Sequence, residues 1–85
     1  MKKFECIITE PMGIHARAAG RLIKEISVFE SSIIIKRNGQ TADCKRLMAL
    51  MALGVKCREN VTFMIEGADE DMASIKLEAF CRENL

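Results

Sequence analysis

The sequence predicts an α+β fold of the open-faced β-sandwich class, with element order βαββαβα. In this fold three helices cover one face of a four-stranded antiparallel sheet. Three observations support it. Apolar residues alternate near residues 3–9 and 61–66, they recur at helical spacing after residues 15 and 69, and Asn38-Gly39 marks a tight hairpin. The 85 residues suit a single domain, which we place at residues 1–85.

The first strand is predicted over residues 3–9, and Pro11 and Gly13 then form a loop. Its inward side chains alternate along the strand: Phe4, Cys6 and Ile8. The first helix is predicted over residues 16–28. Its buried stripe has i, i+3, i+4, i+7 spacing: Ala19, Leu22, Ile23 and Ile26. Another face is basic: Arg17, Arg21 and Lys24. That face is either an ordinary solvated surface or a binding surface.

The middle of the chain contains the hairpin and a short helix. Residues 33–36 are rich in β-branched side chains and pair across the turn with residues 40–44. Seven apolar residues at 47–53 then predict a short helix that ends at Gly54. A short helix cannot bury all its sides, so we expect Met48 or Met51 to be exposed, with core packing as the alternative.

The last strand and helix follow a turn at Glu59-Asn60. Residues 61–65 alternate as a half-buried strand, and Asp69 is expected to cap the final helix. The buried stripe of that helix is predicted from its spacing: Ala73, Leu77, Phe80 and Cys81. Residues 69–71 are all acidic, which favours a first-turn charge arrangement over a metal site.

The composition narrows the class of function. With 49% hydrophobic residues the chain has enough material for a packed core. The net charge of +1 gives no electrostatic case for nonspecific nucleic-acid binding, and without Trp or Tyr the chain is poorly supplied with platforms for base stacking.

Four widely spaced cysteines without a C-x-x-C pair argue against structural zinc: Cys6, Cys44, Cys57 and Cys81. The N-terminal residues show no signal pattern, and no apolar run approaches the length of a membrane span. We therefore expect a cytoplasmic protein with reduced thiols, three of them buried, and neither metal nor cofactor.

His15 is the only histidine, and it lies immediately before the first helix with Arg17 two positions later. The free N–H groups at a helix start produce a positive field of roughly half an elementary charge. That field disfavours a cationic imidazole and favours a phosphoryl dianion, to which a guanidinium adds forked donors. The pattern points to a phosphoryl-carrying histidine. A histidine that merely caps or decorates the helix is the alternative.

Several segments together resemble the HPr family, the histidine-containing phosphocarriers of the bacterial phosphoenolpyruvate:sugar phosphotransferase system. They are Gly13-Ile14-His15-Ala16-Arg17, the Asn38-Gly39 turn, KRLMALMALGV at 45–55 and EGADEDMA at 66–73. The resemblance covers essentially the whole chain. It implies that His15 accepts a phosphoryl group at Nδ1 from enzyme I, ultimately from phosphoenolpyruvate, and passes it to sugar-specific IIA proteins.

The resemblance also implies roles for other residues. Arg17 would stabilise the phosphoryl group, and both partners would dock on one surface: Gly20, Lys24, Leu47, Met48 and Met51. Such a protein is a covalent carrier rather than a turnover enzyme, and nothing demands that it be more than a monomer.

Three positions depart from the family pattern. Ala18 replaces the usual proline, Met12 replaces a frequent Ser or Asn, and Arg46 replaces the regulatory serine of many Gram-positive relatives. Arg46 is also a poor N-cap, and its charge opposes the helix dipole. We therefore expect serine-type regulation to be absent. A regulatory module with the same docking surface but weak phosphotransfer is the main alternative; an independent hydrolase or metalloenzyme lacks a second catalytic group near His15.

Overall fold

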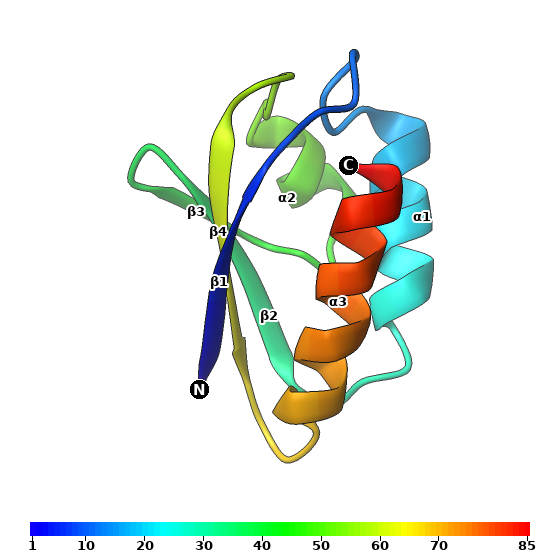
Figure 1. Ribbon diagram of the computed structural model, residues 1–85, viewed down its shortest axis with the longest axis vertical. Coiled ribbons are helices and arrows are strands. Elements are labelled where there is room, and N and C mark those ends of the chain that lie inside the picture. Colours follow the sequence, from blue (N-terminus) through cyan, green and yellow to red (C-terminus); the bar gives the residue numbers. More distant parts are fainter.

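The computed structural model describes all 85 residues. Its elements follow the predicted order (Figure 1), and they are β1 (Lys2–Ile7), α1 (Ala16–Ile26), β2 (Ser32–Arg37), β3 (Gln40–Asp43), α2 (Leu47–Ala52), β4 (Asn60–Glu66) and α3 (Glu70–Asn84).

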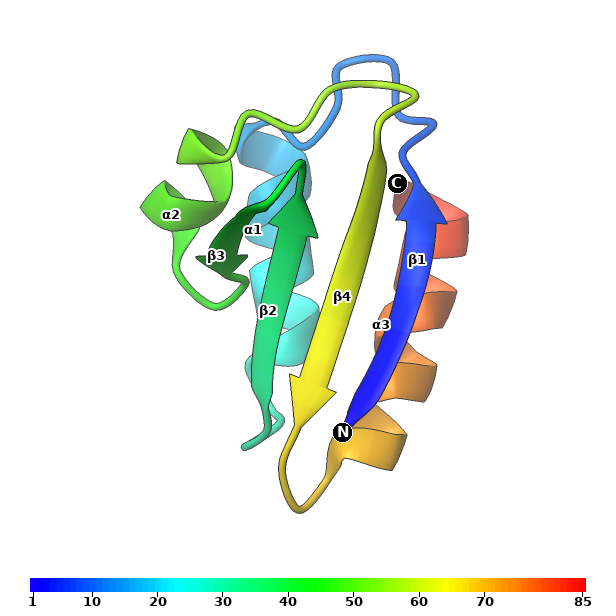
Figure 2. The ribbon, with the colours of Figure 1, turned by 90° about the vertical axis from the view of Figure 1, so that its left-hand side faces the viewer.

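The four strands form one sheet with the spatial order β1-β4-β2-β3, and every neighbouring pair is antiparallel. Figure 2 shows the sheet from its open side, with the three helices behind it. The predicted fold class is therefore confirmed. None of the three helices has the length and apolar character needed to cross a bilayer.

The core lies between the sheet and the helices. Inward side chains of the central strands are fully buried: Ile33, Ile35, Val61, Phe63 and Ile65. Phe4 on β1 stacks against Phe63, with ring centroids 5.3 Å apart. The predicted stripe of α1 is buried except at Ile23, which is half-buried, and all four predicted residues of α3 are buried. The periodicity of apolar residues was sufficient to predict these buried positions, because each element packs one of its sides into the core.

Several predicted boundaries were wrong by one or two residues. The first helix ends at Ile26 rather than at residue 28. Val28 is 75% exposed, so a longer helix would gain no stability from burying that side chain. The first strand ends at Ile7, because the N–H groups of Thr9 and Glu10 donate to the Leu85 carbonyl instead of to a strand. Asn60, predicted to lie in a turn, begins β4.

The prediction of three buried cysteines was also wrong. Cys44 and Cys81 are buried, whereas Cys6 and Cys57 are only partly covered. All four thiols are free. Cys6 lies on an edge strand, where one side of an inward residue stays open to solvent, and Cys57 lies in a surface loop.

Asp69 occupies the N-cap position of α3 but does not cap it with its side chain. Its carboxylate instead accepts hydrogen bonds from the N–H of Glu30 (2.9 Å), the N–H of Ser31 (3.0 Å) and the Ser31 hydroxyl. The Ser31 hydroxyl, followed by the Glu30 N–H, holds the pKa of Asp69 below its usual range. The carboxylate therefore ties the α1–β2 loop to the start of α3.

Candidate functional site

The loop from residue 10 to residue 15 is positioned by a close backbone contact with the α2–β4 loop. The N–H of Ile14 donates to the Val55 carbonyl at 3.0 Å, and the N–H of Gly13 donates to the Glu10 carbonyl at 2.8 Å. Gly13 is buried and has a φ of +68°, and a Cβ placed there would overlap the Val55 carbonyl oxygen. Only glycine fits both the conformation and the space.

Val55 is held in turn by a network anchored on β2. Arg37 donates from Nη1 to the Gly54 carbonyl at 2.8 Å and to Glu59 Oε1 at 2.9 Å. The same Glu59 oxygen accepts the N–H of Lys56 at 2.6 Å. The Lys56 N–H and then the Arg37 guanidinium lower the pKa of Glu59, against the opposing effect of desolvation. The support beneath the His15 loop is therefore a hydrogen-bonded turn.

His15 is the N-cap residue of α1, with extended backbone angles of φ −86° and ψ 178°. Its carbonyl accepts the N–H of Ala19 at 2.8 Å, but its imidazole makes no capping hydrogen bond. The ring therefore does not cap the helix, whereas the alternative that it merely decorates the helix start is not tested by this geometry. The side chain is 26% exposed, and Nε2 lies 3.8 Å from Glu10 Oε1.

Three consecutive amides at the start of α1 have no acceptor in the protein: those of Ala16, Arg17 and Ala18. No acidic residue stands in this first turn to compete for them. Unpaired N–H groups and the positive end of the helix dipole favour an anion beside His15.

A pocket of about 290 Å³ lies around the imidazole. It is lined by residues of the β1–α1 loop, α1 and α3: Glu10, Met12, His15, Arg17, Ala18, Arg21, Phe80 and Asn84. Arg17 and Arg21 are exposed and form no ion pair, so two guanidinium groups are available to a ligand. The pocket thus combines a ring nitrogen, free amides and free cations, which suits an oxyanion such as a phosphoryl group.

The pocket also contains residues that sequence reasoning did not assign to the site. Glu10 lies five positions before His15, and its proximity in sequence was an available signal. Phe80 and Asn84 lie on α3, and their presence depends on how the last helix packs on α1, which no local pattern reports.

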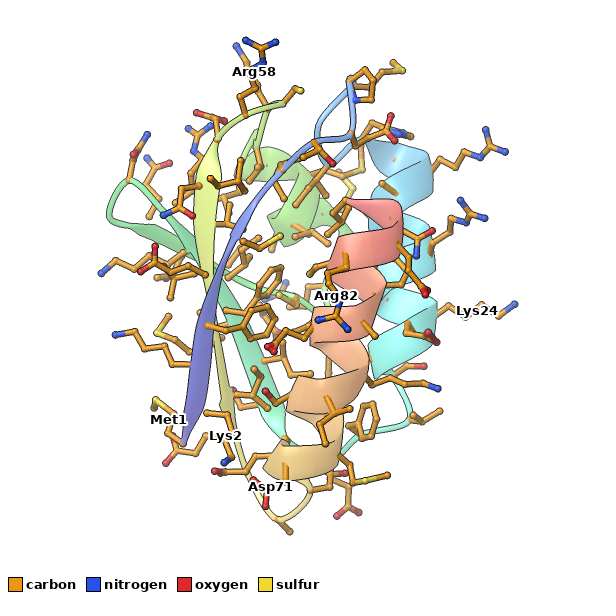
Figure 3. The ribbon with its side chains drawn as sticks, viewed as in Figure 1. Met1, Lys2, Lys24, Arg58, Asp71 and Arg82 are labelled. Carbon is orange, nitrogen blue, oxygen red and sulfur yellow. The ribbon has the colours of Figure 1, made fainter.

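The residues expected at the docking surface lie outside this pocket. Gly20 and Lys24 are exposed on α1, and Figure 3 shows Lys24 pointing away from the helix layer. On α2, Met48 is 77% exposed, Leu47 42% and Met51 38%, whereas Leu50 is fully buried. The expected exposure of the methionines is therefore confirmed. α1 and α2 pack together, and α2 and the start of α1 lie in the same half of the molecule (Figures 1 and 2).

The start of α2 agrees with the expectation that Arg46 is a poor cap. Arg46 is the N-cap residue, and it makes no side-chain capping bond. The polar support comes from Asp43 instead, which accepts the N–H of Lys45 on its carboxylate at 2.9 Å and the N–H of Arg46 on its carbonyl at 3.1 Å.

Comparison with known proteins identifies relatives of the whole chain. Residues 2–83 match the family model described as "PTS HPr component phosphorylation site". The chain is 38% identical over 85 residues to the phosphocarrier protein HPr of Mycoplasma genitalium, covering 99% of this chain and 97% of that one. A Mycoplasma histidine-containing phosphocarrier protein superposes with a TM-score of 0.92 at 35% identity, over 96% and 93% of the two chains. An HPr structure from Thermoanaerobacter tengcongensis gives 0.94 at 30% identity, over 99% and 94%.

Proposed function

The chain belongs to the HPr family of phosphocarriers of the phosphotransferase system, and we propose that His15 is the residue that carries its phosphoryl group. The observation that carries this proposal is the uncapped imidazole beside three free amides at the start of α1. No other histidine exists in the chain.

In the proposed transfer, the Nδ1 lone pair of His15 attacks phosphorus while the bond between phosphorus and the donor breaks. The imidazole gains positive charge as the new N–P bond forms. Glu10 lies at the opposite edge of the ring, 3.8 Å from Nε2. Its carboxylate favours the tautomer with the proton on Nε2, which leaves Nδ1 free to attack, and it balances the developing charge.

The phosphoryl oxygens would be held by the amides at the start of α1 and by the Arg17 guanidinium. Both kinds of donor are unpaired in the protein, so binding requires no internal hydrogen bond to break. Ala18 contributes an amide here that proline would lack. The departure from the family motif therefore adds one donor while it removes a rigid ring.

We propose enzyme I as the donor and sugar-specific IIA proteins as the acceptors, both docking on the exposed residues of α1 and α2. Exposed methionines suit a surface that must accept several partners, because their side chains repack readily. Arg46 and the absence of any hydroxyl residue from 44 to 60 support a carrier without serine-type regulation. Four free thiols are in keeping with a cytoplasmic location.

The test is incubation with phosphoenolpyruvate and the cognate enzyme I, followed by intact mass. We expect a gain of one phosphoryl group that is lost in mild acid, and no gain for His15→Ala at an unchanged thermal midpoint. Arg17→Ala and Arg21→Ala form a matched pair, and we expect the greater loss of rate for Arg17, which lies in the first helical turn.

Labelling that persists in His15→Ala would overturn the assignment. If the native chain gained no phosphoryl group yet still bound enzyme I, the regulatory module would replace the carrier. The three departures at Met12, Ala18 and Arg46 are the features that favour that second function.

A further inference from the structure

The α2–β4 loop holds the loop that carries His15 at both of its ends. At the first end, the N–H of Ile8 donates to the Glu59 carbonyl at 3.0 Å, and the Ile8 carbonyl accepts a further N–H of the same loop at 2.6 Å. At the second end, the N–H of Ile14 donates to the Val55 carbonyl at 3.0 Å. Figures 1 and 2 show the two loops side by side at one end of the molecule. The position of His15 therefore depends on the shape of the α2–β4 loop.

Two side chains close the α2–β4 loop around Val55. Arg37 reaches from the end of β2 and donates to the carbonyl of the residue before Val55 at 2.8 Å. Glu59 accepts the N–H of the residue after Val55 at 2.6 Å. Arg37 and Glu59 are joined to each other at 2.9 Å. One ion pair thus fixes the Val55 carbonyl from both sides.

This ion pair is better suited to positioning a loop than to stabilising the whole fold. The side chains of Arg37 and Glu59 are 19% and 30% exposed, and a partly exposed ion pair contributes little to the free energy of unfolding. Arg37 makes both of its bonds through Nη1, and its Nε is the only buried side-chain nitrogen or oxygen without a partner. The guanidinium is therefore held against the loop although one of its donors stays unsatisfied.

We propose that Arg37 and Glu59 are positioning residues for phosphoryl transfer to His15, an inference that rests on the function proposed above. The ion pair fixes the Val55 carbonyl, which holds Ile14, and the next residue is His15 at the start of α1. A displacement of about 1 Å at a reacting group can lower a rate by roughly 100-fold. Neither Arg37 nor Glu59 lines the His15 pocket, so their effect passes through the backbone.

The test measures phosphoryl transfer in a single turnover, by intact mass, from enzyme I that is phosphorylated beforehand and present in excess. Rates at several enzyme I concentrations give a limiting rate and the concentration at which half of that rate is reached. We expect the limiting rate to fall about tenfold in Arg37→Met and in Glu59→Gln, while the half-rate concentration stays within about twofold of the native value. Urea titration establishes that each variant is folded at the assay temperature.

Two further variants serve as controls. Arg37→Lys should recover most of the limiting rate, because one nitrogen makes both bonds of the arginine and an ammonium group has three donors. Asp71→Asn removes a different ion pair, which joins Asp71 to Lys2 at 3.1 Å. Figure 3 shows that pair at the end of the molecule opposite Arg58, so its loss should leave both kinetic values unchanged.

Amide hydrogen exchange reports on the loop without enzyme I. The Ile14 N–H should exchange faster in Arg37→Met than in the native chain, whereas the N–H of Phe63 in the central strand β4 should exchange at the native rate. A pair that merely stabilised the fold would change the exchange of both amides together and leave the limiting rate of the folded variant unchanged.

Native limiting rates in folded Arg37→Met and Glu59→Gln would overturn the inference, as would a loss in Arg37→Lys equal to that in Arg37→Met. A change confined to the half-rate concentration would assign the ion pair to docking instead. In each of these cases His15→Ala would still take up no phosphoryl group. Labelling of His15→Ala would overturn the proposed function itself, and this inference with it.

Discussion

The start of α3 and the start of α1 differ in how their charged side chains are paired. At the start of α3, the Asp69 carboxylate accepts three hydrogen bonds, and Glu70 accepts the N–H of Gly67 at 3.1 Å and the N-terminal ammonium at 2.9 Å. At the start of α1, the amides and guanidinium groups have no protein partner. The α3 start also leaves the amides of Asp71 and Met72 without a protein acceptor, but two acidic residues stand in its first turn. The α1 start has no acidic residue, so its positive end is left to bind an anionic ligand.

The comparison separates residues that stabilise the fold from residues that take part in the proposed phosphoryl transfer. The His15 end still depends on the fold through its backbone, because Ile14 hydrogen-bonds Val55 and Gly13 packs against it. Variants at the α3 start should therefore change stability alone. Variants at the α1 start should change phosphorylation alone, unless they disturb that backbone contact.

Among variants at the two helix starts, the largest effect is expected for Gly13→Ala, which should disrupt both stability and phosphorylation. The new Cβ would overlap the Val55 carbonyl and lie 2.8 Å from the Lys56 Cα, at a φ of +68°. We expect a loss of roughly 2–3 kcal/mol in the free energy of unfolding, measured in urea. Gly20→Ala is the control, since nothing lies within 4 Å of its added Cβ and alanine favours the helix. Equal stabilities for the two variants would contradict this account of the loop.

Asp69→Asn should lower the thermal midpoint by several degrees and leave phosphorylation by enzyme I unchanged. The folded pKa of Asp69 is lowered by the Ser31 hydroxyl and the Glu30 N–H. Its contribution to stability is therefore present above the unfolded pKa, about 4, and is lost as the pH falls through the lower folded value. Thermal midpoints measured from pH 6 down to pH 2 should fall less steeply for the variant. A variant as acid-sensitive as the native chain would assign that sensitivity to Glu59 and Glu70, whose pKa values are also lowered.

Ala18→Pro tests the role of the free amides at the α1 start, because it removes one of them without breaking a hydrogen bond. We expect stability to rise by about 0.5–1 kcal/mol through a more restricted unfolded chain. The phosphorylation rate should change by less than about tenfold, the value of one hydrogen bond. Thermal scans measure the first effect, and the initial rate of phosphoryl incorporation from enzyme I measures the second. A fall in the thermal midpoint would show that proline does not fit this turn.

The smallest effect on stability is expected for Met48→Glu, within about 0.5 kcal/mol, because the side chain is 77% exposed. The enzyme I concentration that gives the half-maximal rate should nevertheless rise severalfold. Leu50→Ala is the contrasting variant on the same helix, and its buried side chain should cost about 2–5 kcal/mol. If Met48→Glu left the kinetics with both enzyme I and a IIA protein unchanged, the docking surface would lie elsewhere.

Local patterns in the sequence were enough for most of the fold. The Asn38-Gly39 turn, the stripe at Ala19, Leu22 and Ile26, and the alternation at Val61 and Phe63 each report on a few neighbouring residues. Helix ends were less predictable. Ser27 and Val28 lie outside α1 because both are exposed to solvent, and the spacing of apolar residues does not show this change of surroundings.

The sequence by itself determined the order of elements and the single histidine at a helix start, since each follows from periodicity, turn chemistry or motif. It favoured exposed methionines on α2 but left core packing open. Only the tertiary structure decided which partner Asp69 takes, that Phe80 and Asn84 reach the His15 pocket, and that Cys6 and Cys81 line one hollow. These arrangements bring together residues 38 or more positions apart. They depend on how the helices pack across the sheet, and no pattern within one segment records that packing.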